Sequence, residues 1–248
     1  MLDGLYCEFL KLKRTKFYIL VSLISLLCIF FSTLNKKYVA QLNWYGYFSN
    51  FEFIAFSIFY AFVIPNVVSY MFVREYQNKT ACIEFSYPMG RFGSFINKFI
   101  MSVLVIACIY ITGFVLVILS GFIFMKTPLT MTIIVDNLKV FAVSFVFQIA
   151  LVPICGFIAS ISKNMIVPFI YSCAVIAGNA NYLMGVKYKE YIFSILPAAV
   201  IAKLGTTVCP VPIPIKLVIN SFDIYLGLTV FISGFIVCIL YYRKANIY

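Results

Sequence analysis

The chain has 248 residues, of which 64% are hydrophobic and only 11% are charged, and its mean hydropathy is +1.04. Soluble domains carry about one quarter charged residues, so this composition excludes an ordinary soluble globule and predicts an integral membrane protein. The 19 basic residues outnumber the 8 acidic ones. In a membrane protein such an excess favours topology signals and contact with anionic lipid over nucleic-acid binding.

The chain begins with an amphipathic segment at residues 1–16. Leu5 and Phe9 fall on one side of a helical projection, and Lys11 and Arg14 fall on the other. This pattern predicts a helix that lies in the membrane interface with its basic side toward the lipid headgroups. Long apolar runs follow and predict an all-α protein with a single transmembrane domain. The six predicted spans are residues 17–34, 51–73, 99–125, 138–161, 165–186 and 219–242.

Six crossings place both termini on one side of the membrane. Basic residues are densest just before the first run. Because the leading helix usually sets the orientation, both termini are predicted to be cytoplasmic and the protein to lie in the plasma membrane. Residues 187–218 hold several prolines and apolar stretches too short to cross. We expect short re-entrant or interfacial helices there, on the external side.

Residues 74–98 interrupt the apolar runs with a polar stretch. A charged side chain at the centre of a bilayer costs about 2.5–3.5 kcal/mol, so this stretch is expected in the cytoplasm or at its interface with the membrane. Its less polar residues recur at spacings of three and four, as on one face of a helix that ends at Pro88 and Gly90. They are Val73, Tyr76, Thr80, Ile83 and Tyr87. The pattern predicts a cytoplasmic helix that projects from the second span; a helix lying flat in the interface is the alternative.

With these features the chain resembles the membrane subunits of ABC type-2 exporters, in particular the short permeases of bacterial bacitracin-resistance and lantibiotic-immunity systems. The resemblance covers essentially the whole chain: the N-terminal helix, the six spans, the cytoplasmic segment and the long external segment. Its sequence patterns are Glu8-x-x-Lys11-x-Lys13-Arg14 and Glu75-x4-Thr80 … Pro88-x2-Arg91-Phe92 … Lys98. Lys79 departs from it, because many relatives have glycine before the threonine.

The resemblance implies that the segment after the second span is a coupling helix. Such a helix docks on a cytoplasmic ABC ATPase and transmits the ATP-driven closure of two ATPase subunits to a pair of permeases, which are identical or sister chains. Arg91 and Lys98 would tie the return segment to headgroups or to the ATPase. By position, the ATPase-coupling residues are Arg74, Glu75, Lys79, Thr80, Glu84 and Arg91.

The chain itself carries no signature of catalysis. It has no GxxxxGK[ST] motif and no histidine, which removes P-loop nucleotide binding, histidine metal sites and histidine general bases. The chain is therefore predicted to be no enzyme and to bind no metal or cofactor of its own. ATP and Mg²⁺ are expected in the partner ATPase.

Polar residues within the spans mark a candidate translocation path or permease interface. Gln148 lies near the centre of the fourth span, and Asn179 and Asn181 lie toward the outer end of the fifth. Such groups are costly in a bilayer and often face an interior or a cavity, but a hydrogen bond that only joins two helices also explains them. Glu52, at the outer start of the second span, is a weaker candidate, because a boundary charge in water accounts for it.

The predicted function is ATP-driven export of a peptide antibiotic, a lantibiotic or another amphipathic or lipid-like compound, as in resistance and immunity. A secondary transporter is an alternative, but it needs ionisable residues in mid-membrane, and no predicted span has a central carboxylate. A membrane scaffold or sensor subunit that transports nothing is the other alternative. An intramembrane enzyme is disfavoured by the lack of histidine and of catalytic motifs.

Overall fold

The structure is a computed structural model of the chain. Within the part that it describes the chain is helical and contains no β-strand, which confirms the predicted all-α class. The residues described are 2–15, 17–34, 43–80, 90–125, 127–183, 193–203 and 221–244.

Among the described residues, four helices are long and apolar enough to cross a membrane. They are the continuous helix Trp44–Gln77, α7 (Gly90–Phe124), α8 (Met131–Ser162) and α11 (Ser221–Lys244). The shorter helices are α1 (Leu2–Arg14), α2 (Phe17–Thr33), α9 (Ile166–Leu183) and α10 (Leu196–Lys203), the last preceded by the 3₁₀ turn η3 (Phe193–Ile195). The chain is therefore a multi-pass membrane protein, and a count of six crossings stays a prediction.

The continuous helix, which we call the rod, is not a regular α-helix throughout. Its parts are α4 (Trp44–Ile54), the π-helical turn η1 (Ala55–Phe59) and α5 (Tyr60–Gln77). The rod begins before the predicted start of the second span at residue 51 and ends beyond residue 73. Trp44, Tyr47 and Phe48 are buried, so tertiary packing extends the helix past the apolar run that hydropathy detects.

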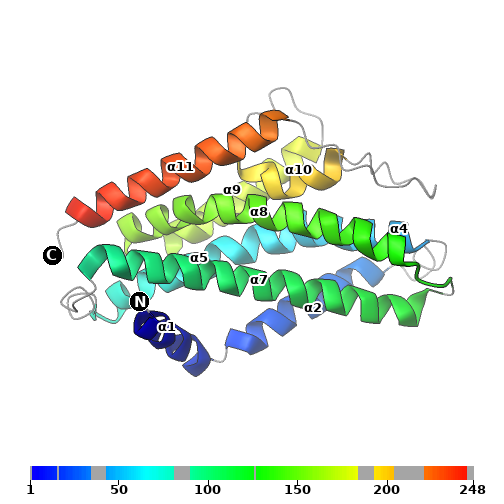
Figure 1. Cartoon of the computed structure of the whole chain (residues 1–248), viewed down its shortest axis with the longest axis horizontal. Coiled ribbons are helices and arrows are strands. Elements are labelled where there is room, and N and C mark those ends of the chain that lie inside the picture. The colour runs from blue at the N-terminus through cyan, green and yellow to red at the C-terminus, as the bar shows by residue number, and fades with distance from the viewer. Residues whose placement is uncertain are drawn as a thin grey trace.

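The long helices lie roughly side by side (Figure 1). α5 packs against α8 and α9, α11 packs along α8, and α2 packs against α7. α1 and the C-terminal end of α11 lie at one end of the bundle, and α4 and α10 lie toward the other (Figure 1). We call these the α1 end and the α4 end.

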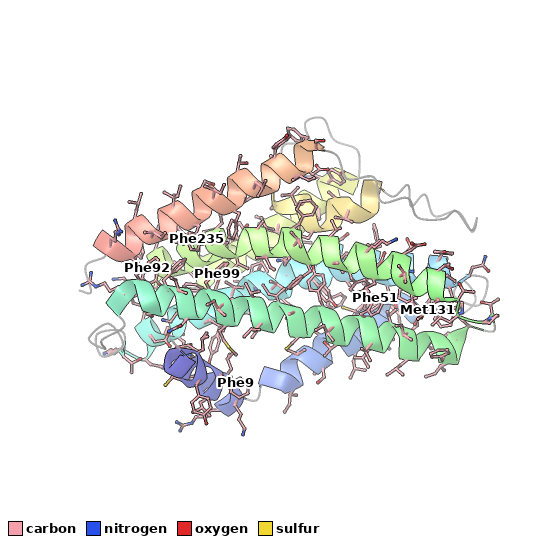
Figure 2. The ribbon with its side chains drawn as sticks, viewed as in Figure 1. Phe9, Phe51, Phe92, Phe99, Met131 and Phe235 are labelled. Carbon is pink, nitrogen blue, oxygen red and sulfur yellow. The ribbon has the colours of Figure 1, made fainter. Side chains whose placement is uncertain are left out.

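Aromatic side chains fill the interior between the rod, α7 and α8. The ring of Phe56 lies 5.6 Å from that of Tyr110 and 5.1 Å from that of Phe141, and the rings of Tyr60 and Tyr110 are 5.0 Å apart. Phe51 of α4 joins this core (Figure 2) and stacks on Phe141 at 6.3 Å. Because such large side chains bury much apolar area and pack in preferred ring geometries, this core fixes how α4 and η1 sit on α8.

The outward-facing side chains of the long helices are also apolar. Exposed examples are Ile111 and Ile123 of α7, Val146 of α8 and Leu240 of α11. An apolar surface of this extent is unfavourable in water, but it is the expected outer surface of helices that lie in lipid. The few polar side chains on these outer faces, such as Thr229 and Ser233 of α11, bond to carbonyls of their own helix.

The prediction of one continuous helix over residues 73–87 is wrong at residues 78–80. α5 ends at Gln77, a turn follows at residues 78–80, and residues 81–89 lie outside the described part of the chain. α7 begins at Gly90, well before the predicted start of the third span at residue 99. Within the predicted external segment 187–218, the structure describes only Phe193–Lys203, which form η3 and α10.

Candidate functional site

Five charged side chains form a cluster at the α1 end, which we call the ion-pair cluster. Lys11 Nζ lies 2.6 Å from Glu8 Oε1 and 3.0 Å from Glu75 Oε1. Arg74 Nη2 lies 3.0 Å from Glu8 Oε2 and 3.1 Å from Glu75 Oε1. Lys98 Nζ lies 3.0 Å from Glu75 Oε2. The cluster thus joins α1, the last turns of α5 and the first part of α7.

Helix geometry places the members of the cluster. Glu8 lies four residues before Leu12 on α1, so both fall on one face of the helix, and both are buried against the bundle. Phe9 lies on the outer side of α1 (Figure 2) and is exposed. Lys11 reaches the carboxylates from the edge and keeps 38% of its side chain exposed, whereas Lys98 of α7 is 1% exposed. The face of α1 that carries Glu8 therefore points toward the bundle.

Because the cluster is buried, its ion pairs hold α1, α5 and α7 in a fixed arrangement. Desolvation of a charge costs several kcal/mol, and the attraction of its partners offsets this cost only while the whole set is present. Three cations surround two carboxylates, so neither carboxylate is left without a positive partner. In the described part of the chain, no group of three or more acidic, cysteine or histidine side chains is placed to hold a metal ion.

α5 ends directly after the cluster in a Schellman motif. The Thr80 N–H donates to the Glu75 carbonyl at 2.9 Å, and the Lys79 N–H donates to the Tyr76 carbonyl at 3.2 Å. The motif needs a left-handed backbone at the residue before Thr80, and Lys79 takes that conformation with a φ of 57°. Glycine is usual at this position because a Cβ atom is crowded there. The departure at Lys79 therefore falls on the residue that turns the chain out of the helix.

The residues predicted to couple to an ATPase fall into two groups. Arg74 and Glu75 are buried in the ion-pair cluster. Lys79 and Thr80 are exposed just beyond the helix end. The two groups therefore differ in what they can contact. Arg74 and Glu75 join the end of the rod to α1 and α7, whereas the side chains of Lys79 and Thr80 are accessible at the surface.

The return segment gives a mixed result. Arg91 is half-buried near the start of α7, and Glu84 lies outside the described residues. Lys98 does not reach headgroups or a partner protein, because it is buried and paired with Glu75. That prediction is wrong for Lys98. A lysine beside an apolar run usually extends to the membrane surface, and the sequence does not show that Glu75 pairs with Lys98 in the interior.

A second group of polar residues lies in the interior toward the α4 end. Gln148 and Asn179 are buried and line one cavity between the rod, α8, α9, η3 and α10. The cavity measures about 10 Å³, which is about the room that one water molecule needs. Asn179 Nδ2 donates to the Ser57 carbonyl of η1 at 2.8 Å. The structure thus brings Gln148 and Asn179 together, whereas Asn181 is exposed.

The cavity lies where the rod departs from regular helical bonding. In η1 the Tyr60 N–H bonds to the Ala55 carbonyl five residues back, and such π turns are frequent at functional sites. Pro65 has no N–H, so the carbonyl of Ala61 loses the donor that it would have in an unbroken helix. Ala61 and Pro65 both line the cavity.

The interpretation of Glu52 as a boundary charge in water is wrong. Glu52 is 1% exposed and lies inside the rod, one turn before Phe56. Among the residues that the structure describes, no cation forms an ion pair with Glu52 and no donor reaches its Oε1 atom. The rod begins earlier than hydropathy suggests. Glu52 therefore lies within the helix, and its carboxyl group lies in the interior of the bundle.

The sequence patterns do not predict Glu8 or Asn137 as site residues; Glu8 appears there only in a family pattern. Glu8 shares the buried face of α1 with Leu12, and a carboxylate on such a face needs a cation, which is the signal that the sequence offers. Asn137 of α8 is fully buried and donates through Nδ2 to the Ile133 carbonyl at 2.7 Å. Its signal is its spacing from Gln148, about three turns along the same helix face.

The residues of both sites fall within a known protein family. The family model described as ABC-2 family transporter protein matches residues 4–181, from α1 to the last turn of α9. This range contains the ion-pair cluster, the rod and the cavity-lining residues of α8 and α9. No curated protein matches the chain. Because the matched range covers well over half of the 248 residues, the chain belongs to the ABC-2 transporter family.

Proposed function

We propose that this chain is the permease subunit of an ATP-driven exporter that moves a peptide antibiotic, a lantibiotic or another amphipathic compound out of the cell or the membrane. ABC-2 permeases are membrane transport components that work with an ABC ATPase and are not themselves catalytic. In the proposed assembly two ATPase subunits bind a pair of permeases, identical or sister chains. The apolar helices of those permeases supply the path.

The observation that carries this proposal is the pairing of Glu75 with Lys98. Glu75 and Lys98 lie near the two ends of the predicted coupling segment, residues 74–98, and their charged atoms are 3.0 Å apart. Arg74 and Lys11 extend the same network to α1. A force on the segment therefore reaches the rod, α7 and α1 together. This is what a rigid-body motion driven from outside the membrane requires.

The proposed coupling residues divide by burial. Arg74 and Glu75 hold the base of the segment, and Lys79, Thr80, Glu84 and Arg91 are proposed to meet the ATPase. α1 and the C-terminal end of α11 lie at the same end as this base (Figure 1). We propose that this end is cytoplasmic, so that the segment is within reach of a cytoplasmic motor.

Co-purification tests the coupling role. The tagged permease is expressed with the ABC ATPase from its own operon, and the bound ATPase, identified by its GxxxxGK[ST] peptide, is quantified. The double variant Lys79→Glu with Thr80→Arg is expected to reduce recovery of the ATPase at least about tenfold. It reverses the charge at residue 79 and places a larger side chain at residue 80 of the proposed interface. Lys139→Glu, an exposed site at the α4 end, is the matched control and is expected to change nothing. Undiminished recovery with the first variant removes the coupling role.

A second candidate, ion-coupled secondary transport, gains one observation from the structure. Such a transporter needs a carboxyl group within the membrane, and Glu52 is a carboxyl group buried inside the helix bundle. The two candidates differ in their energy source. Export that stops when the proton gradient is collapsed, but continues when ATP is depleted, supports the secondary transporter. The opposite result supports the proposed exporter.

A further inference from the structure

Two hydrogen bonds join the rod to α9 on either side of the interior cavity. Asn179 Nδ2 donates to the Ser57 carbonyl at 2.8 Å, and Asn66 Nδ2 donates to the Ser172 hydroxyl at 2.9 Å. The later residue of the rod thus meets the earlier residue of α9, so the two helices run antiparallel. Ala61, which lies between Ser57 and Asn66 on the rod, lines the cavity. The cavity therefore lies between two fixed contacts of the same helix pair.

Polar side chains of α8 and α9 line this cavity. Gln148 is 3% exposed and Asn179 is 2% exposed. Asn179 uses Nδ2 for its bond to the rod, and among the residues that the structure describes no donor reaches its Oδ1 atom. The Tyr171 hydroxyl is buried beside Cys155 and has no nitrogen or oxygen partner in the described part of the chain. Such unmatched groups cost free energy, so this lining favours a partner that both donates and accepts hydrogen bonds.

The backbone of the rod offers a further acceptor at the same place. Pro65 has no N–H, so the carbonyl of Ala61 lacks the donor that a regular helix would give it. Both residues line the cavity. In a membrane helix that contains proline, an ordered water molecule is one of the groups that can replace the missing donor. One small donor between the rod and α9 can therefore serve both the Ala61 carbonyl and Asn179 Oδ1.

Water matches both the chemistry and the size of this cavity. The volume of about 10 Å³ is about that of one water molecule. Water donates two hydrogen bonds, here to Asn179 and Ala61, and accepts others, here from the Gln148 amide or the Tyr171 hydroxyl. The lining contains no carboxylate to balance a metal ion, and an apolar group would leave the amides unmatched. The body of an amphipathic compound is far too large for this volume.

We propose that this cavity binds one water molecule that joins the rod to α8 and α9. The water replaces the hydrogen bond that Pro65 removes from the rod and satisfies the buried amides of Gln148 and Asn179. These two residues then act by holding helices together, which is one of the two roles that polar groups within the spans can have. The inference goes beyond the proposed export function and does not depend on it, because the water belongs to the fold of the permease alone.

Hydroxyl-radical footprinting of the full-length chain in lipid nanodiscs tests the proposal. An X-ray pulse converts bound water into hydroxyl radicals, which oxidise the side chains beside it, and mass spectrometry measures the oxidation rate at each residue. Cys155 lines the cavity and is 2% exposed, whereas Cys28 is 0% exposed on α2. Cys155 is expected to oxidise at least about tenfold faster than Cys28, because apolar interiors stay dry. Equal rates at the two cysteines overturn the proposal.

Variants locate the water. Gln148→Leu and Asn179→Leu each remove polar atoms from the lining at similar side-chain size, and each is expected to slow the oxidation of Cys155 at least about fivefold by removing one hydrogen-bond partner of the water. Asn181→Leu, at an exposed site on α9, is the matched control and should keep the rate of the parent. Undiminished oxidation of Cys155 in the folded cavity variants overturns the proposal. Thermal unfolding verifies that each variant is folded; if neither cavity variant is, the comparison of Cys155 with Cys28 in the parent protein decides alone.

Discussion

Arg74 and Glu8 are 66 residues apart in the sequence, yet Arg74 Nη2 lies 3.0 Å from Glu8 Oε2 and both side chains are buried. This pair binds the N-terminal helix to the end of the rod. It gives Glu8 and Arg74 an internal role, in place of contact with headgroups or partners. The same guanidinium lies 5.8 Å from the ring centroid of Tyr70, which packs it further into the interior.

Arg74→Met is expected to destabilise the protein by about 3–5 kcal/mol, because it leaves Glu8 buried with less positive charge around it. Thermal unfolding in detergent measures the effect. Adding Glu8→Gln to Arg74→Met should recover part of the loss, since it removes the unmatched carboxylate. Asp136→Asn, at the exposed pair with Lys139, is the control and should change stability by less than about 0.5 kcal/mol. A single Arg74→Met variant as stable as this control contradicts the cluster.

Lys79→Gly is expected to stabilise the protein by about 1 kcal/mol, because glycine adopts the left-handed conformation of Lys79 without crowding. Lys79→Val should have the opposite effect, since a β-branched side chain is most strained there. Lys163 at the end of α8 has a φ of 50° and offers a second instance. Its replacement by glycine should gain less, because its Nζ lies 5.7 Å from the ring centroid of Tyr76. A loss of stability with Lys79→Gly would show that the helix does not end as described.

Gly121→Ala is expected to displace the indole of Trp44, because a Cβ atom built on Gly121 meets the Trp44 ring. The indole now donates from Nε1 to the Thr127 carbonyl at 2.7 Å in a buried position. Displacement should shift the tryptophan emission to longer wavelength and lower the thermal midpoint. Leu119→Ala, at an exposed site on the same helix, serves as the control and should leave the emission unchanged. Unaltered emission in Gly121→Ala contradicts the packing of α4 on α7.

Cys7 tests the proposed orientation. It is exposed on α1, next to the ion-pair cluster. In a variant that retains only this cysteine, a membrane-impermeant maleimide is expected to label inside-out vesicles at least about tenfold faster than intact cells, because the bilayer excludes a charged reagent. Fast labelling of intact cells would place the α1 end outside, away from any cytoplasmic ATPase.

Cys108 and Cys173 test which surface faces lipid. Both are exposed in the structure, on α7 and α9, yet they lie among apolar outward-facing side chains. A lipid-soluble maleimide should label them, whereas a water-soluble one should not. Cys28 and Cys238 are buried and should resist both reagents until the protein is unfolded. Rapid reaction of Cys108 with the water-soluble reagent would mean that this face of α7 lines water.

The sequence predicts the helical class and the membrane environment because both depend on composition and on the length of apolar runs. It also predicts a polar break after the second predicted span, whose helix is the rod. It does not predict the end of that helix at Gln77. The helical spacing of less polar residues continues beyond Gln77, but backbone hydrogen bonds of Lys79 and Thr80 form a turn there. The burial of Glu52 and Lys98 escapes it for a similar reason. Whether a charge at the end of an apolar run faces water depends on what packs against it, and for Lys98 that information lies in a distant residue, Glu75.

The π turn at Ala55–Phe59 sets the rotational phase between the two halves of the rod. An α-helix advances about 100° per residue, so the residue gained in this turn rotates everything after it relative to everything before it. One side of the rod must face the phenylalanines of α8 near its start, and another must present Arg74 and Glu75 to α1 and α7 at its finish. Shortening the chain by one residue here would swing the distal half away from its partners, so the two ends are satisfied together only by this local irregularity.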